Sequence, residues 1–254
     1  MAVKRFRMSS NAWQLVGLAV LAVITFGVVA YALVPQSAPS AETRPAATAA
    51  VTPTVTEPPA PKPIVAFIGD SYSAGTGATL TENRWTSVLS GDRGWTESNF
   101  ARGGTGYVTA VGRNAQAACG LDYCESYLEM VPQIIAAKPD VVIVSGGSND
   151  RGLSRAVAAN VESVFAELRK GLPDAEIIAI NPIWVDGERP AGAGVFGQAV
   201  ADAATAAGCK SVDIGQPYLG RPDLIADDAV HPNDAGHAEL AAVTAAALKA
   251  AGIS

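Results

Sequence analysis

The chain of 254 residues is long enough for one globular domain with appendages, and 49% of its residues are hydrophobic. Its formal net charge is −6, and residues 64–254 carry 13 of the 18 Lys and Arg but 22 of the 24 Asp and Glu. This acidic part has no cluster of basic residues, which argues against a nucleic-acid partner bound through its phosphates. With three cysteines, two histidines and no Cys-x-x-Cys pair, no zinc site or other metal site is expected.

The N-terminal segment has the pattern of a membrane anchor. Residues 12–34 contain no charge, and a helix of about 23 residues can span a ~30 Å hydrocarbon core. Basic residues precede this run, so the positive-inside rule places the N-terminus in the cytoplasm and the remainder outside. We predict a cytoplasmic stub and a single-pass signal-anchor helix over residues 1–34. A cleaved signal peptide is the alternative, and it also exports the rest of the chain.

Residues 35–63 consist mainly of Pro, Ala, Thr and Ser. Such a segment cannot bury enough apolar surface to offset the entropy lost on ordering. We predict a disordered tether that holds the following domain away from the membrane.

Short apolar runs alternate with helical patterns from residue 64 to the C-terminus. Strands are predicted at residues 64–68, 97–101, 141–144, 177–180 and 212–214, and helices at residues 82–90, 123–137, 154–170, 197–207 and 233–250. Continuous apolar strands between helices imply a parallel sheet that is covered on both faces. The prediction for residues 64–254 is therefore an α/β domain, a three-layer α/β/α doubly wound sheet with functional groups at the C-terminal ends of its strands.

Ser71 follows the first predicted strand in a Gly-Asp-Ser turn. A serine at a strand-to-helix turn exposes its hydroxyl, and the N–H groups of the helix start favour negative charge. The same pattern is typical of an ordinary helix cap. Taken alone, the turn does not distinguish a nucleophile from a cap.

Two glycine-rich stretches follow later strands. Gly104 lies in the first of them, where an unhindered N–H could bind a substrate oxyanion, although a plain loop would have the same composition. Asn149 lies in the second, after the most apolar strand. Its amide could stabilise developing negative charge, or it could simply form a turn.

Asp228 and His231 are three residues apart in the last loop before the C-terminal helix. A turn can bring the carboxylate to one imidazole nitrogen and leave the other nitrogen to accept a serine proton. The other histidine, His237, falls on the helix. His231 is therefore the expected base of any serine mechanism.

In this order the motifs resemble those of the SGNH hydrolases, also called GDSL esterases and lipases. The resemblance covers about three quarters of the chain and rests on Gly-Asp-Ser at residues 69–71, Gly104, Gly-x-Asn-Asp at residues 147–150 and Asp-x-x-His at residues 228–231. It implies the flavodoxin-like SGNH fold. Tyr72 departs from the leucine that is common after the family's serine.

The resemblance also implies roles for individual residues. Ser71 would be the nucleophile, His231 the general base and Asp228 the residue that orients it. The Ser71 N–H, the Gly104 N–H and the Asn149 side chain would hold the oxyanion, with the N–H of the adjacent Gly103 as the alternative to that of Gly104. The reaction would be acyl transfer through a covalent acyl-enzyme, with no cofactor.

The substrate is the least constrained part of the prediction. Four residues next to the motifs or just beyond a strand could line the cleft: Tyr72, Tyr107, Arg151 and Trp184. An exported, tethered enzyme meets envelope glycans and lipids, so we expect hydrolysis of small acyl esters on envelope carbohydrate or glycolipid by a chain assumed to be monomeric. The alternatives are an acyltransferase that uses the same residues, a lipase for longer esters, and a catalytically inactive wall-binding module.

Cys119 and Cys124 bracket four residues, and in an oxidising compartment they are expected to form a local disulfide. Cys209 would remain unpaired and buried.

Overall fold

The computed structural model describes residues 60–185 and 192–253. The predicted anchor and nearly all of the predicted tether lie outside these residues. Within the described ranges, no helix is both long and apolar enough to cross a membrane.

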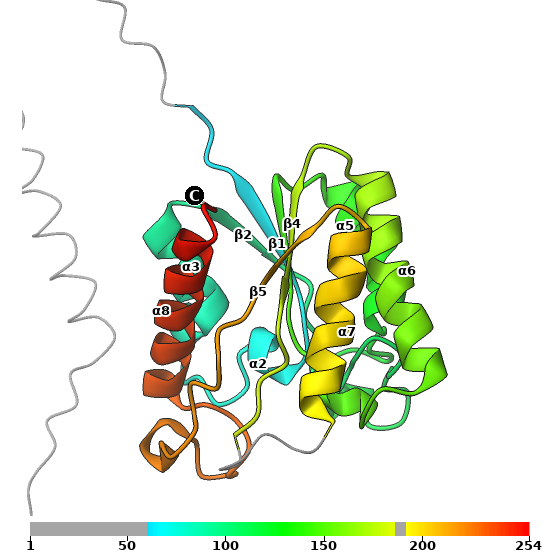
Figure 1. Ribbon diagram of the computed structural model, residues 1–254. Coiled ribbons are helices and arrows are strands. Elements are labelled where there is room, and N and C mark those ends of the chain that lie inside the picture. Colours follow the sequence, from blue (N-terminus) through cyan, green and yellow to red (C-terminus); the bar gives the residue numbers. More distant parts are fainter. Residues whose placement is uncertain (1–59, 186–191, 254) are drawn as a thin grey trace, which may run out of the picture. The chain divides into compact units, whose positions relative to one another are not determined.

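Five parallel strands form one sheet in the order β2-β1-β3-β4-β5 (Figure 1). They are β1 (Ile64–Ile68), β2 (Thr96–Asn99), β3 (Val141–Val144), β4 (Glu176–Ile180) and β5 (Lys210–Val212). The chain adds β2 on one side of β1 and then places β3 on the other side, so the strand order reverses at β1. In such sheets a crevice opens at the C-terminal ends of the strands where the order reverses, and this is where ligands bind.

Helices cover both faces of the sheet (Figure 1). On one face lie α3 (Trp85–Arg93) and α8 (Asp234–Ala250), and on the other lie α5 (Tyr127–Ala137), α6 (Arg155–Gly171) and α7 (Ala193–Ala206). Side chains alternate across a strand, so Val65 and Phe67 join the core beneath α3 and α8 while Ala66 and Ile68 join the other core. This two-sided burial explains the continuous apolar strands, and the predicted α/β fold with flanking helices is confirmed.

Several element boundaries differ from the sequence prediction. The helix predicted from residue 123 begins at Tyr127, because Cys124 pairs with Val111 in a bridge and Ser126 forms a capping box with Glu129. The helix predicted from residue 197 begins at Ala193, and the last strand runs three residues and ends at Val212. The short helices α2 (Ser71–Ala74) and α4 (Ala115–Cys119) complete the elements that shape the site, and the sequence pattern did not predict α4.

Candidate active site

Ser71 is the first residue of α2, directly beyond the C-terminal end of β1. The helix cap is the preceding residue, because Asp70 Oδ1 accepts the N–H of Tyr72 at 3.1 Å. The Ser71 N–H belongs to the first turn, where N–H groups have no acceptor inside the helix. Asp70 therefore caps the helix, and the Ser71 hydroxyl takes no part in that cap.

The structure brings Ser71, His231 and Asp228 into one hydrogen-bonded chain. His231 Nε2 lies 2.9 Å from Ser71 Oγ, and His231 Nδ1 lies 2.6 Å from Asp228 Oδ2. Asp228 Oδ1 also accepts the N–H groups of His231 and Val230, each at 2.9 Å. Hydrogen bonds from the His231 backbone, the His231 ring and the Val230 backbone lower the pKa of Asp228 to about 2. An ionised carboxylate thus orients the imidazole, and the other ring nitrogen faces the serine hydroxyl.

The second histidine has a different environment. His237 is buried in α8, its Nδ1 accepts the N–H of Trp85 at 3.3 Å and its Nε2 donates to the carbonyl of Thr76 at 3.1 Å. Burial lowers the pKa of His237, in keeping with a neutral ring that donates at one nitrogen and accepts at the other. His237 connects α8 to the segment that follows α2, and it does not reach Ser71.

Gly104 and Asn149 reach the same cleft as Ser71. Gly104 has a left-handed backbone (φ 76°), and its N–H donates to no protein acceptor among the described residues. Asn149 lies in a short 3₁₀ turn, η2 (Ser148–Asp150), and one of its two amide hydrogens is donated to the carbonyl of Thr105 at 2.9 Å. The second amide hydrogen has no acceptor among the described residues.

Asp150 holds these two donor-bearing segments together. Its carboxylate accepts the N–H groups of Tyr107, Val108 and Thr109 at 2.7 to 3.1 Å and the Thr109 hydroxyl at 2.8 Å. The loop after Gly104 is thereby fixed to the turn that carries Asn149. The place of Asp150 in the Gly-x-Asn-Asp motif predicts a structural role for it, and these bonds are such a role.

Asp70, the residue before Ser71, is buried, with 2% of its surface exposed. Burial raises the pKa of this carboxyl to about 6, despite the bonds from the Tyr72 N–H and from Ser148 Oγ at 3.5 Å. A buried carboxyl that is not fully paired favours its neutral form.

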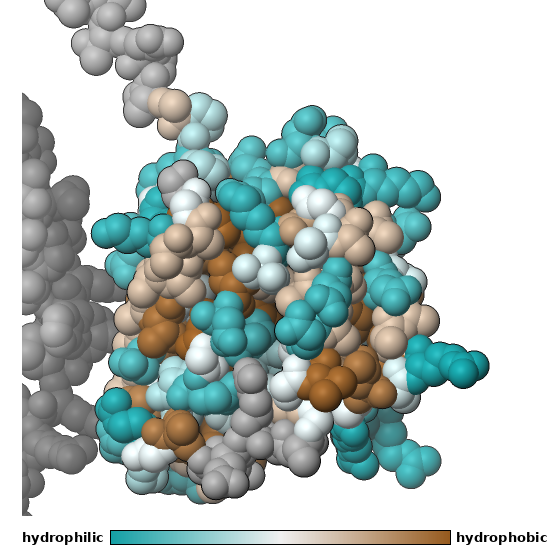
Figure 2. Space-filling model, in the orientation of Figure 1, coloured by the Kyte–Doolittle hydropathy of each residue, from teal (hydrophilic) through white to brown (hydrophobic). Residues whose placement is uncertain are grey.

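Ser71 and His231 open onto a cleft of about 540 Å³. Tyr72 and Trp184 line this cleft, as the sequence predicted. Arg151 instead lines a neighbouring pocket of about 560 Å³ that shares Ser148 and Trp184 with the cleft. Apolar side chains of that pocket include Leu153, Val195 and Phe196, and Figure 2 shows an apolar area beside the start of α7.

The prediction that Tyr107 lines the cleft is wrong. Only 1% of Tyr107 is exposed, and its ring packs against Tyr127, Phe165 and Phe196 in the core. Its backbone N–H is held by Asp150, so the side chain turns inward beneath the site.

The predicted disulfide between Cys119 and Cys124 is present, and Cys209 is free and buried. The disulfide closes the end of α4, whose Ala117 and Ala118 form part of the cleft wall. Gly103 lies directly against this wall, because a Cβ at that position would come within 2.0 Å of the Ala118 carbonyl oxygen.

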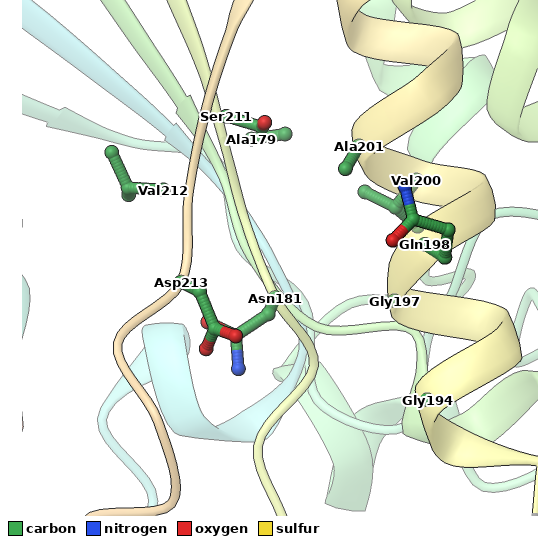
Figure 3. Close-up of a pocket in the computed structure, with 10 residues that line it drawn as sticks. All are labelled: Ala179, Asn181, Gly194, Gly197, Gln198, Val200, Ala201, Ser211, Val212 and Asp213. Carbon is green, nitrogen blue, oxygen red and sulfur yellow. The ribbon is translucent and has the colours of Figure 1, made fainter. Parts of the chain in front are cut away.

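A separate pocket of about 170 Å³ lies between α7 and the ends of β4 and β5 (Figure 3). Three of its polar side chains have partners: Asn181 accepts the N–H of Ile214 at 2.7 Å, Gln198 donates to Asp202 at 2.8 Å and Asp213 accepts the N–H of Gly215 at 2.8 Å. None of the predicted site residues lines it. In the described part of the chain, no three His, Cys, Asp or Glu side chains are grouped so that they could hold a metal ion.

Residues 67–239 match the sequence model of the GDSL-like Lipase/Acylhydrolase family. The chain belongs to this family. It is 30% identical over 186 residues to the GDSL lipase Rv0518 of Mycobacterium tuberculosis, an alignment that covers 70% of this chain and 78% of that relative. The GDSL motifs noted above are therefore family motifs, and the chain is a hydrolase of the GDSL/SGNH type.

Solved structures share the fold. The psychrotrophic esterase EstA from Pseudoalteromonas sp. is 16% identical, with a TM-score of 0.58 over 74% of this chain and 98% of that chain. A variant of Axe2, an acetyl-xylooligosaccharide esterase from Geobacillus stearothermophilus, is 20% identical, with a TM-score of 0.54 over 76% of this chain and 95% of that chain. The parallel sheet with flanking helices is thus the SGNH-hydrolase fold of the GDSL family.

Proposed function

We propose that this hydrolase cleaves carboxylic esters through an acyl-enzyme formed on Ser71. The hydrogen-bonded chain from Ser71 through His231 to Asp228 carries the proposal. His231 Nε2 takes the hydroxyl proton as Ser71 Oγ attacks the ester carbonyl, and it then protonates the leaving alcohol. Water then attacks the acyl-enzyme while His231 takes its proton, and the acid is released as His231 returns a proton to Ser71 Oγ. Asp228 stays ionised throughout and stabilises the imidazolium.

Three donors would stabilise the oxyanion of each tetrahedral intermediate. These are the Ser71 N–H, the Gly104 N–H and the free amide hydrogen of Asn149, and all three residues line one cleft. Donors that are fixed before the reaction stabilise developing charge without reorganisation. The bonds from Asn149 to Thr105 and from the 107–109 segment to Asp150 supply that rigidity.

Small acyl groups on carbohydrate are the substrates that we favour. Axe2 is an acetyl-xylooligosaccharide esterase, and another structure with the same fold is a carbohydrate esterase family 2 enzyme (23% identical, TM-score 0.54). Longer lipid esters are the second candidate, because the curated relative is named a lipase and an apolar pocket adjoins the cleft. A series of p-nitrophenyl esters of increasing chain length separates the two: a maximum at acetate supports the first candidate and a maximum at octanoate or beyond supports the second.

We also propose that the enzyme is exported and tethered to the membrane. The charge-free run at residues 12–34 and the basic residues before it support this location. Protease treatment of intact cells tests it: the catalytic domain is expected to be digested from outside while a cytoplasmic marker survives. Survival of the domain in intact cells and its digestion only after lysis would exclude export.

The decisive test of the mechanism compares two serines of one helix. Ser71→Ala is expected to abolish hydrolysis of p-nitrophenyl acetate by the full chain in detergent. Ser73→Ala, a matched change at a buried serine whose hydroxyl has no partner among the described residues, is expected to retain activity. Wild-type activity in the Ser71→Ala protein would show that another residue is the nucleophile.

A further inference from the structure

Tyr72 connects the segment of the nucleophile with the segment of the base. It follows Ser71 in the chain, and its hydroxyl donates to the carbonyl oxygen of Val230 at 2.7 Å. Val230 in turn precedes His231. One side chain therefore spans from the residue after the serine to the residue before the histidine, across 158 positions of sequence.

The Tyr72 ring also limits where the imidazole can lie. Its centroid is 5.8 Å from that of His231 and 6.3 Å from that of Tyr218. Tyr218 is itself buried, and its hydroxyl donates to Gly236 in α8 at 3.1 Å. With only 8% of its surface exposed, Tyr72 is confined by these neighbours and can act as a rigid support.

The loop that carries the base needs such a support. Residues 227–230 are exposed, and Ala229 has a left-handed backbone (φ 57°). The bonds from the Ala226 N–H to His231 and from the Ala229 N–H to Ala226 shape this turn internally. They do not set its distance from Ser71, whereas the bond from Tyr72 joins the turn directly to the segment of the nucleophile.

We infer that Tyr72 is a positioning residue for the base and keeps His231 Nε2 within hydrogen-bond distance of Ser71 Oγ. The inference rests on the proposed function, in which His231 acts as the base. Tyr72 also lines the cleft, so a role in holding substrate is the competing explanation. The two roles differ in what they change: positioning affects the chemical step, and substrate contact affects binding.

Tyr72→Phe tests the inference, because it removes the hydroxyl that reaches Val230 and keeps the ring. With p-nitrophenyl acetate and the full chain, kcat is expected to fall about 10-fold with KM within about 2-fold, since small misplacements of reacting groups cost up to ~100-fold in rate. Tyr218→Phe is the matched control: it removes a tyrosine hydroxyl of the same aromatic pair that bonds α8, and it is expected to leave kcat within about 2-fold. An unchanged kcat in Tyr72→Phe, or a higher KM with unchanged kcat, would overturn the inference.

A double-mutant cycle separates positioning from a general effect on the fold. If Tyr72 acts through His231, adding Tyr72→Phe to His231→Ala is expected to leave the residual kcat of His231→Ala unchanged. Full additivity of the two losses would overturn the inference. Tm measurements check that each variant is folded. Failure of the proposed function has a different signature, since His231→Ala alone would then retain wild-type activity.

Discussion

The buried carboxyl of Asp70 is expected to make the free energy of unfolding depend on pH, and Asp70→Asn is expected to remove that dependence. Its pKa in the folded chain is about 6, against an ordinary value of 3.8, because burial disfavours the charged form. The folded state therefore retains a proton that the unfolded chain loses between about pH 4 and 6. The stabilising contribution of Asp70 is fully present below about pH 4 and is lost as the pH rises through 6.

The size of this effect follows from the two pKa values. The interval from 3.8 to about 6 corresponds to about 3 kcal/mol. Asp70→Asn removes the titration and keeps an oxygen that can still cap the Tyr72 N–H. The variant is therefore expected to gain about 2.4 kcal/mol in unfolding free energy relative to wild type as the pH rises from 4 to 7, and the rest of the effect falls below pH 4 and above pH 7.

Urea unfolding of both proteins at several pH values, followed by tryptophan fluorescence, measures the difference directly. All groups that titrate alike in the two proteins cancel in that difference. Asp92→Asn, at an exposed position of α3, is the control and is expected to give a difference that is flat with pH. An equally flat difference for Asp70→Asn would contradict the raised pKa of Asp70, because it would mean that the buried carboxyl ionises as readily as one in water.

Three further outcomes are expected from the site. Asn149→Ala should lower kcat by about 10² to 10³-fold with little change in KM, as measured by steady-state kinetics. A change in KM alone would contradict the proposed role of Asn149 as an oxyanion donor. Tyr107→Phe should leave the free energy of unfolding unchanged or raise it by about 1 kcal/mol, since the buried hydroxyl has no partner among the described residues. Urea unfolding measures this, and a clear loss of stability would show that the hydroxyl does have a partner. Replacing Cys119 and Cys124 by serine should lower the free energy of unfolding by about 2 kcal/mol. It should also lower kcat, because the cleft wall beside Gly103 would loosen. An unchanged kcat would show that this wall is rigid without the disulfide.

How far the sequence predicts the fold depends on how deeply an element is buried. The predicted bounds of β1 and β3 agree with the structure, because apolar residues that face both cores leave a continuous signal. The edge strand β2 has the sequence Thr-Glu-Ser-Asn and is only partly buried, so its predicted position was one residue late and ran two residues too far. Helix starts depend on capping contacts such as that of Ser126 with Glu129, which periodicity does not report.

The residues of the candidate site also differ in how well the sequence predicts them. Residues whose chemistry defines a motif were predicted individually, because few residue types can serve as nucleophile, base or oxyanion donor. Neighbours of the motifs were predicted less well, since adjacency does not determine the direction of a side chain. Tyr107 turns into the core because Asp150 holds its backbone, and Arg151 adopts a left-handed conformation (φ 54°) that directs it to the adjoining pocket.

The distance of 2.9 Å between Ser71 and His231 depends on contacts that carry no motif. A Cβ at Gly77 would lie 2.2 Å from the carbonyl oxygen of Pro232, so only glycine lets the segment after α2 approach the residue that follows the base. His237 bonds the same segment to α8, and Tyr72 bonds α2 to the residue before the base. Each contact joins parts of the chain more than 150 residues apart, where no local periodicity exists to reveal it. The motifs therefore identify the residues of the candidate site, and these three contacts explain why Ser71 and His231 lie within hydrogen-bond distance of each other.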